Sequence, residues 1–186
     1  MVYLGALWLP IILSAVLVFV VSSIIHMVLQ THKHEYRKLP GEENIMQTMR
    51  QEGVPPGQYV MPCASSMKDA GSPAMIQKYN EGPVAFVTVL PSGPINMTRG
   101  LILWFLYSVL ISFFVAYLAS RTLTAGTEYL TVFRITGTLA VLGYSLNYLP
   151  DSIWKGAPWS STIKHVGDGI VYGLVTAGVF SWLWPG

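Results

Sequence analysis

Residues 160–186, SSTIKHVGDGIVYGLVTAGVFSWLWPG, decide the fold, because they form the most apolar and the most regularly patterned run of the chain. Small residues recur in this run at every fourth position, and on an α-helix that spacing places them along one face. They are Gly169, Gly173, Ala177 and Ser181. Because a face of small residues lets a second helix approach closely, the run predicts a packed membrane helix.

Asp168, Tyr172 and Thr176 form a second strip in the same run, again at four-residue spacing. Lipid is a poor environment for such polar side chains. We therefore expect this strip to face protein or to line a path for a solute.

The composition indicates an integral membrane protein. Of 186 residues, 52% are hydrophobic and 11% are charged, and the mean hydropathy is +0.49. Soluble domains are less apolar and more charged than this. The Lys and Arg residues form no basic stripe and belong to no nucleic-acid motif, so nucleic acid is not an expected partner.

Three further segments are long and apolar enough to cross a bilayer: residues 3–29, 101–118 and 129–149. Residues 1–10 carry no basic side chain, which favours a retained first helix over a signal peptide. Residues 101–118 repeat the small-residue spacing with Ser108, Ser112 and Ala116.

The predicted fold class is therefore an all-α integral membrane protein with four transmembrane helices. Residues 1–30 hold the first helix, residues 31–99 a polar membrane-associated region, and residues 100–186 a bundle of the other three.

The polar region is expected to be mostly irregular, with short helices and one extended segment. Ser72 and Pro73 are typical of a helix start, with a capping side chain followed by a proline. Residues 84–90, between two prolines, predict a buried strand or an extended segment against the membrane helices.

The positive-inside rule orients the chain. All Lys and Arg residues except Arg121 and Arg134 fall on one side of the predicted bilayer. This places residues 31–99 in the cytoplasm and both termini outside, in an inner or plasma membrane.

Polar side chains near the inner ends of three helices predict a shared shallow pocket. His26, Asn147 and Asp168 lie at similar depth, and ionisable groups at membrane depth are functional candidates. His32 and His34, just beyond the first helix, are expected to be solvated. Arg134 is expected to reach the outer headgroups.

A second candidate site consists of soft ligands. Thioether, thiolate and imidazole groups are those that Cu(I) prefers, which makes a copper-binding membrane protein one alternative. The candidate ligands are Met61, Cys63, Met67, His32 and His34.

No catalytic motif is present: the chain has no phosphate-binding Gly-rich loop, no nucleophile elbow and no His-Glu-x-x-His. No cofactor is indicated. The leading prediction is a non-enzymatic, small integral subunit or assembly protein of a larger membrane complex, with the bilayer and other membrane subunits, like or unlike, as partners. The main alternative is a homo-oligomeric transporter or channel lined by Asp168, Tyr172 and Thr176.

Overall fold

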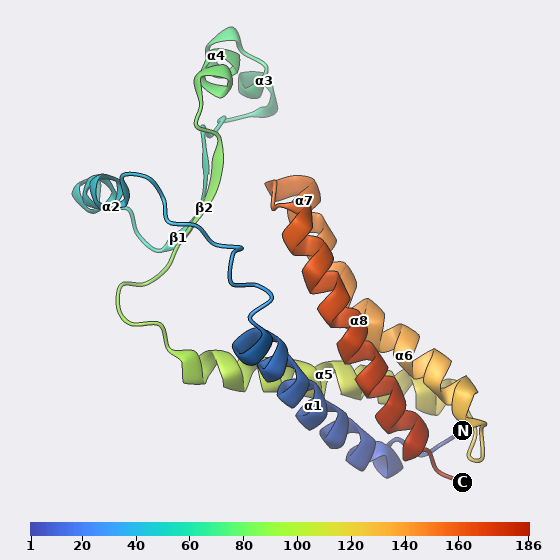
Figure 1. The fold of residues 1–186 in the computed structure, drawn as a ribbon. Helices are drawn as coiled ribbons and strands as arrows, with labels where there is room; N and C mark the ends of the chain where they lie inside the picture. Colours follow the sequence, from blue (N-terminus) through green and yellow to red (C-terminus); the bar gives the residue numbers. More distant parts are fainter. The chain divides into compact units, whose positions relative to one another are not determined.

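The computed structural model describes residues 1–186, and the chain forms two compact units. The helical unit consists of Met1–Tyr36 and Asn96–Gly186, and the polar unit consists of Arg37–Ile95 (Figure 1). Residues 31–36, which we expected in the polar region, belong to the helical unit. This difference matters for the site described below.

The helical unit contains five α-helices and three short 3-10 or π-helical segments. In chain order they are α1 (Trp8–Ser23), α5 (Met97–Thr122), α6 (Tyr129–Ser145), α7 (Leu149–Lys155) and α8 (Trp159–Trp182). A 3-10 turn, Leu4–Leu7, precedes α1, and a π-helical segment, Ile24–Leu29, continues it. A second 3-10 turn, Leu146–Tyr148, joins α6 to α7. Residues 149–155 thus prolong the third helix beyond residue 149, where we expected it to end.

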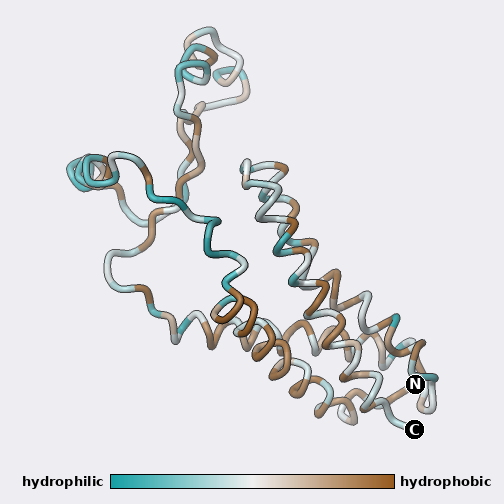
Figure 2. The backbone as a smooth tube through the Cα atoms, viewed as in Figure 1, coloured by the Kyte–Doolittle hydropathy of each residue, from teal (hydrophilic) through white to brown (hydrophobic).

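Three continuous helical segments are long and apolar enough to cross a membrane: Leu4–Leu29, Met97–Thr122 and Tyr129–Lys155. The residues of α1 are almost all hydrophobic (Figure 2). The protein is therefore mostly helical, with the features of an all-α membrane protein. α8 is not among the three segments, because its first half carries Lys164, His165 and Asp168.

The small-residue face of α8 packs directly on the backbone of α6. A Cβ atom added to Gly169 would lie 2.8 Å from the carbonyl of Tyr144, and one added to Gly173 would lie 2.9 Å from the Val141 nitrogen. Such distances leave no room for a side chain. The small-residue face predicted from the sequence is thus a contact between two helices of this chain, α6 and α8 (Figure 1).

The small-residue face of α5 is also buried inside the helical unit. Ser108, Ser112 and Ala116 are all fully covered. α5 packs against α1, where Trp104 Nε1 donates a hydrogen bond of 2.8 Å to Ser22 Oγ. The four long helices therefore share one core, whose fully buried members include Leu7, Val18, Val115, Val132 and Phe180.

The polar unit is more regular than expected. It contains α2 (Glu42–Gln51), β1 (Gly57–Met61), α3 (Met67–Ala70), α4 (Pro73–Glu81) and β2 (Ala85–Val89). Ser72 Oγ accepts a hydrogen bond of 3.2 Å from the Met75 nitrogen, so α4 begins as predicted.

The extended segment of the polar unit is a hairpin strand. β2 pairs antiparallel with β1, in the register Gly57 opposite Val89 and Met61 opposite Ala85. The expectation of a buried strand at residues 84–90 is wrong, because the residues of β2 alternate between half-buried and exposed. Two strands alone have only each other to pack on.

Candidate functional site

A cluster of imidazoles and carboxylates lies where the end of the first helix, the segment after it and the first half of α8 meet. Gln30 adopts a left-handed conformation (φ 50°) and ends the helical segment. The segment that follows, residues 31–36, places the side chains of His32 and Glu35 against the first half of α8. Lys164 Nζ donates a hydrogen bond of 2.9 Å to the Thr31 carbonyl oxygen and fixes this contact.

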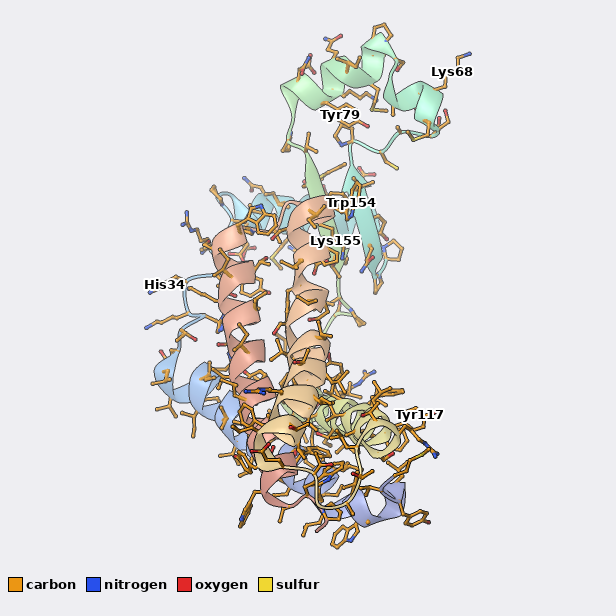
Figure 3. The ribbon with its side chains drawn as sticks, turned by 90° about the vertical axis from the view of Figure 1, so that its right-hand side faces the viewer. His34, Lys68, Tyr79, Tyr117, Trp154 and Lys155 are labelled. Atoms are coloured by element: carbon orange, nitrogen blue, oxygen red, sulfur yellow. The ribbon has the colours of Figure 1, made fainter.

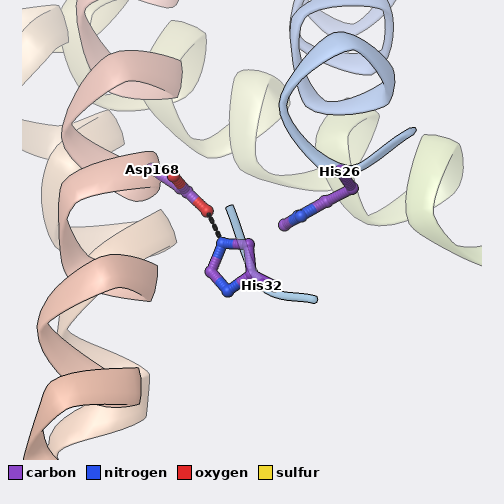
Figure 4. Close-up of side chains that lie close together, drawn as sticks. All are labelled: His26, His32 and Asp168. Atoms are coloured by element: carbon purple, nitrogen blue, oxygen red, sulfur yellow. Dashed lines mark hydrogen bonds and ion pairs between the residues drawn. The ribbon is translucent and has the colours of Figure 1, made fainter. Parts of the chain in front are cut away.

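His32 is at the centre of the cluster. Its Nε2 lies 2.7 Å from Asp168 Oδ2 (Figure 4). Its Nδ1 lies 2.5 Å from Glu35 Oε1. The side chains of His32, Asp168 and Glu35 are 14%, 16% and 9% exposed. Both ring nitrogens are thus in contact with a carboxylate in a partly desolvated place.

His165 adds a third imidazole to the cluster. Its Nε2 lies 3.2 Å from Glu35 Oε2. Its ring stacks on His32 on one face (centroids 4.5 Å apart) and on Tyr148 on the other (4.6 Å). The stack of three rings holds the imidazole planes in fixed orientations.

His26 completes the cluster from the end of the first helix. Its ring lies edge to face on His32, with centroids 4.7 Å apart. One donor atom each of His26, His32 and Asp168 lie within 4.8 Å of one another, and the same is true of His32, Glu35 and His165. Two overlapping sets of three potential metal ligands therefore share His32.

The environment favours the ionised form of Glu35. Burial raises the pKa of its carboxyl, but hydrogen bonds from His32 and Ser161 and the nearby His165 ring outweigh burial and hold the pKa below its usual value. Glu35 therefore serves as an acceptor for both imidazoles.

The structure brings together two of the three residues of the predicted pocket. His26 and Asp168 meet, but Asn147 is exposed and forms no side-chain hydrogen bond. The 3-10 turn at Leu146–Tyr148 presents Tyr148 to the cluster instead.

The expected solvation of the two histidines after the first helix holds for one of them. His34 is exposed and points away from the helices (Figure 3), whereas the prediction for His32 is wrong. Sequence reasoning also missed Glu35 and His165. The available signal was the three-residue spacing of His32 with Glu35 and of His165 with Asp168.

The soft-ligand candidates are divided between the two units. In the polar unit, Cys63 is exposed and Met67 is almost fully exposed. In the helical unit, His32 is held by Asp168 and Glu35.

The polar strip of α8 faces the interior of this chain's own bundle. Tyr172 and Thr176 are buried, and Thr176 Oγ1 donates a hydrogen bond of 2.9 Å to the Tyr172 carbonyl oxygen. Asp168, at the start of the strip, reaches the cluster.

A cavity of about 460 Å³ adjoins the cluster. His26, His165 and Asp168 line one part of it, and the aromatic rings of Trp104, Tyr144 and Tyr172 line another. The cavity thus joins the polar cluster to the aromatic interior of the bundle.

Comparisons of this chain with protein-family models, with curated proteins and with solved structures found no match. The functional argument consequently rests on the geometry of the cluster and the cavity.

Proposed function

We propose that this is an integral membrane protein whose helical bundle binds a divalent transition-metal ion at His26, His32 and Asp168. One observation carries the proposal: two imidazoles and a carboxylate, from segments far apart in sequence, place one donor atom each within 4.8 Å of one another. Two histidines and one carboxylate form a recurrent ligand set for such ions.

The position of Glu35 supports a metal ligand role for His32. Metal-bound histidines usually donate their second ring N–H to a carboxylate, which fixes the tautomer and makes the ring a better ligand. Glu35 lies 2.5 Å from His32 Nδ1 and can accept the N–H of that nitrogen, while Nε2, which donates to Asp168 in the absence of an ion, becomes a ligand once it gives up its proton. The carboxylate that orients His32 is therefore already in place.

The distances in the cluster require little movement to admit an ion. Two ligands bound tetrahedrally at about 2.0–2.1 Å from zinc are about 3.3 Å apart. His32 Nε2 and Asp168 Oδ2 are 2.7 Å apart. To admit the ion, the distance between these two atoms has to increase by well under about 1 Å. His26 is the most exposed of the three residues and can approach from the solvent side.

The donor set favours Zn²⁺ or a similar ion over the alternatives. Imidazole nitrogen suits zinc, iron and nickel, whereas Mg²⁺ and Ca²⁺ prefer oxygen alone and Cu(I) prefers sulfur. No sulfur atom belongs to the cluster, so this site differs from the copper site suggested by the sequence.

We further propose that α8 is a fourth transmembrane helix. Support comes from its close packing along α6 and from the burial of Tyr172 and Thr176 within the bundle, where they avoid lipid. The charged first turns of α8 then lie at the interface between lipid and water. The cluster is on the same side of the membrane as residues 31–99. The positive-inside rule favours the cytoplasm for that side.

An accessory role in a larger membrane complex stays a second proposal, as does a homo-oligomeric transporter. Both have less support than metal binding, because the small-residue faces and the polar strip that suggested them pack inside this chain. Gentle extraction of the protein from its native membrane tests both proposals. Co-purification of unlike chains supports the accessory role, and a ring of copies of this chain supports the transporter. A free monomer counts against both.

The metal proposal is tested by titrating Zn²⁺ into the EDTA-treated full chain in lipid nanodiscs, with calorimetric detection. We expect one high-affinity ion per chain in the wild type and loss of that site in His32→Ala. His34→Ala is the matched control, because His34 is an exposed imidazole two residues away. Equal binding by the two variants, or none by the wild type, would contradict the proposal.

A further inference from the structure

The cavity beside the cluster has an aromatic wall that metal binding does not use. The ring of Trp104 lies 6.3 Å from that of Tyr144 and 5.8 Å from that of Tyr172, and the two tyrosine rings lie 5.7 Å apart. Aromatic rings at such separations attract a further flat ring through stacked or edge-to-face contacts. The cavity of about 460 Å³ is also within the usual range for small organic ligands.

Tyr172 offers this cavity an unused hydrogen bond. Its side chain is 4% exposed, and its hydroxyl is buried without any partner. Burying an unpaired hydroxyl is costly, so such groups usually meet a ligand or a water molecule. Tyr144, by contrast, already donates to the Ser108 carbonyl oxygen.

The remaining polar groups around the cavity indicate a neutral ligand with acceptor atoms. The imidazole of His26 can donate a hydrogen bond, whereas that of His165 donates to Glu35. The one carboxylate that lines the cavity, Asp168, is engaged by His32 at 2.7 Å. An organic cation therefore finds no free negative charge here, whereas a molecule with carbonyl oxygens finds donors.

The mouth of the cavity is apolar. Met27, near the end of the first helix, and Met97 and Leu101, in the first turns of α5, line it and are exposed. Both helices belong to segments apolar enough to cross a membrane. A lipid-soluble molecule can therefore enter from the bilayer.

We propose that this cavity binds a neutral, lipid-soluble quinone. Its ring lies against Trp104, one carbonyl oxygen accepts a hydrogen bond from Tyr172, and the other faces the imidazole of His26. A quinone fits because it combines a flat ring with two acceptor oxygens at opposite ends, which matches a deep hydroxyl and an outer imidazole. The inference does not depend on the metal ion, since Tyr172 and Trp104 are not among the proposed ligands. His26 is shared by the two sites, and its imidazole can bind an ion through one nitrogen and donate to the quinone through the other.

The test uses the full chain in lipid nanodiscs with EDTA present and duroquinone as the probe. The readout is the part of the tryptophan fluorescence that Trp104→Phe removes. We expect saturable quenching of that part. Durene, the same methylated ring without oxygens, should compete at least about tenfold more weakly, because it accepts no hydrogen bond.

Two matched variants separate recognition from partitioning into lipid. Tyr172→Phe deletes only the hydroxyl and should weaken duroquinone binding about fivefold to tenfold, the range expected for one lost hydrogen bond. Tyr117→Phe, an exposed tyrosine of α5, should leave binding unchanged. Non-saturating quenching, equal competition by durene, or equal affinity in wild type and Tyr172→Phe would each overturn the proposal. Zinc binding without duroquinone binding would overturn this inference alone.

Discussion

His32 and Asp168 are 136 positions apart in sequence, yet His32 Nε2 lies 2.7 Å from Asp168 Oδ2. This contact ties the segment after the first helix to the first half of α8. Lys164 of α8 donates a hydrogen bond to the Thr31 carbonyl oxygen and connects the same two parts. The proposed metal site therefore also ties the segment after the first helix to the last long helix.

Replacing Asp168 with asparagine should remove the only carboxylate of the first ligand set. We expect Asp168→Asn to weaken Zn²⁺ binding by about 100-fold or more, because even partners outside the coordination sphere contribute about 10–100-fold. Zinc titration with a competing chelator measures this. Asp151→Asn, at an exposed pair with Lys155, is the control and should bind normally.

Glu35 should act by positioning His32 and not by binding the ion. Glu35→Gln keeps the size of the side chain but removes the charge that holds the imidazole tautomer. We expect about 10–100-fold weaker Zn²⁺ binding at unchanged stoichiometry. Glu43→Gln, an exposed glutamate of α2, should have no effect. If Glu35→Gln bound zinc as the wild type does, the ring orientation of His32 would have to depend on something else.

The α6 and α8 contact should tolerate no added methyl group at Gly173. A Cβ atom there would lie 2.9 Å from the Val141 backbone nitrogen, so the helices must separate. We expect Gly173→Ala to lower the free energy of unfolding by about 1–3 kcal/mol, the usual range for overpacking. Thermal or SDS unfolding measures it. Gly178→Ala, on the same helix with open space around it, should change stability little.

The packing of the bundle could be predicted from the sequence further than its site could. Four-residue spacing alone indicated that Gly169 and Gly173 form a helix contact, because a helical period fixes which residues share a face. The site depends instead on the left-handed conformation of Gln30, which ends the first helix at a residue with no special preference for that conformation. The sequence does not show this helix end, so it indicates only that His32 and Glu35 belong to a solvated basic run.

The loss of Asn147 from the predicted pocket has a similar cause. Helical spacing placed it at the depth of Asp168, but the 3-10 turn at Leu146–Tyr148 changes the angular position of each side chain there. As a result Tyr148 stacks on His165, and Asn147 is exposed. Local departures from the α-helix are not visible in a hydrophobic pattern, and in this chain they occur at the site.

The proposed orientation makes a prediction for the single cysteine. Cys63 is exposed and lies in the polar unit, which we place in the cytoplasm. An impermeant maleimide applied to intact cells should therefore leave Cys63 unmodified, and permeabilised cells should show full labelling. Equal labelling of intact and permeabilised cells would contradict this orientation and indicate the opposite one.

X-ray absorption at the zinc edge tests the central claim most directly. The sample is the full chain in nanodiscs, cleared with EDTA and reloaded with one equivalent of Zn²⁺. The account predicts a first shell of nitrogen and oxygen at about 2.0–2.1 Å, with the outer-shell scattering of two imidazoles and no sulfur. The imidazole scattering should fall by one ring in His26→Ala. A sulfur shell at about 2.3 Å, or a zinc ion surrounded only by oxygen, would contradict a site at His26, His32 and Asp168.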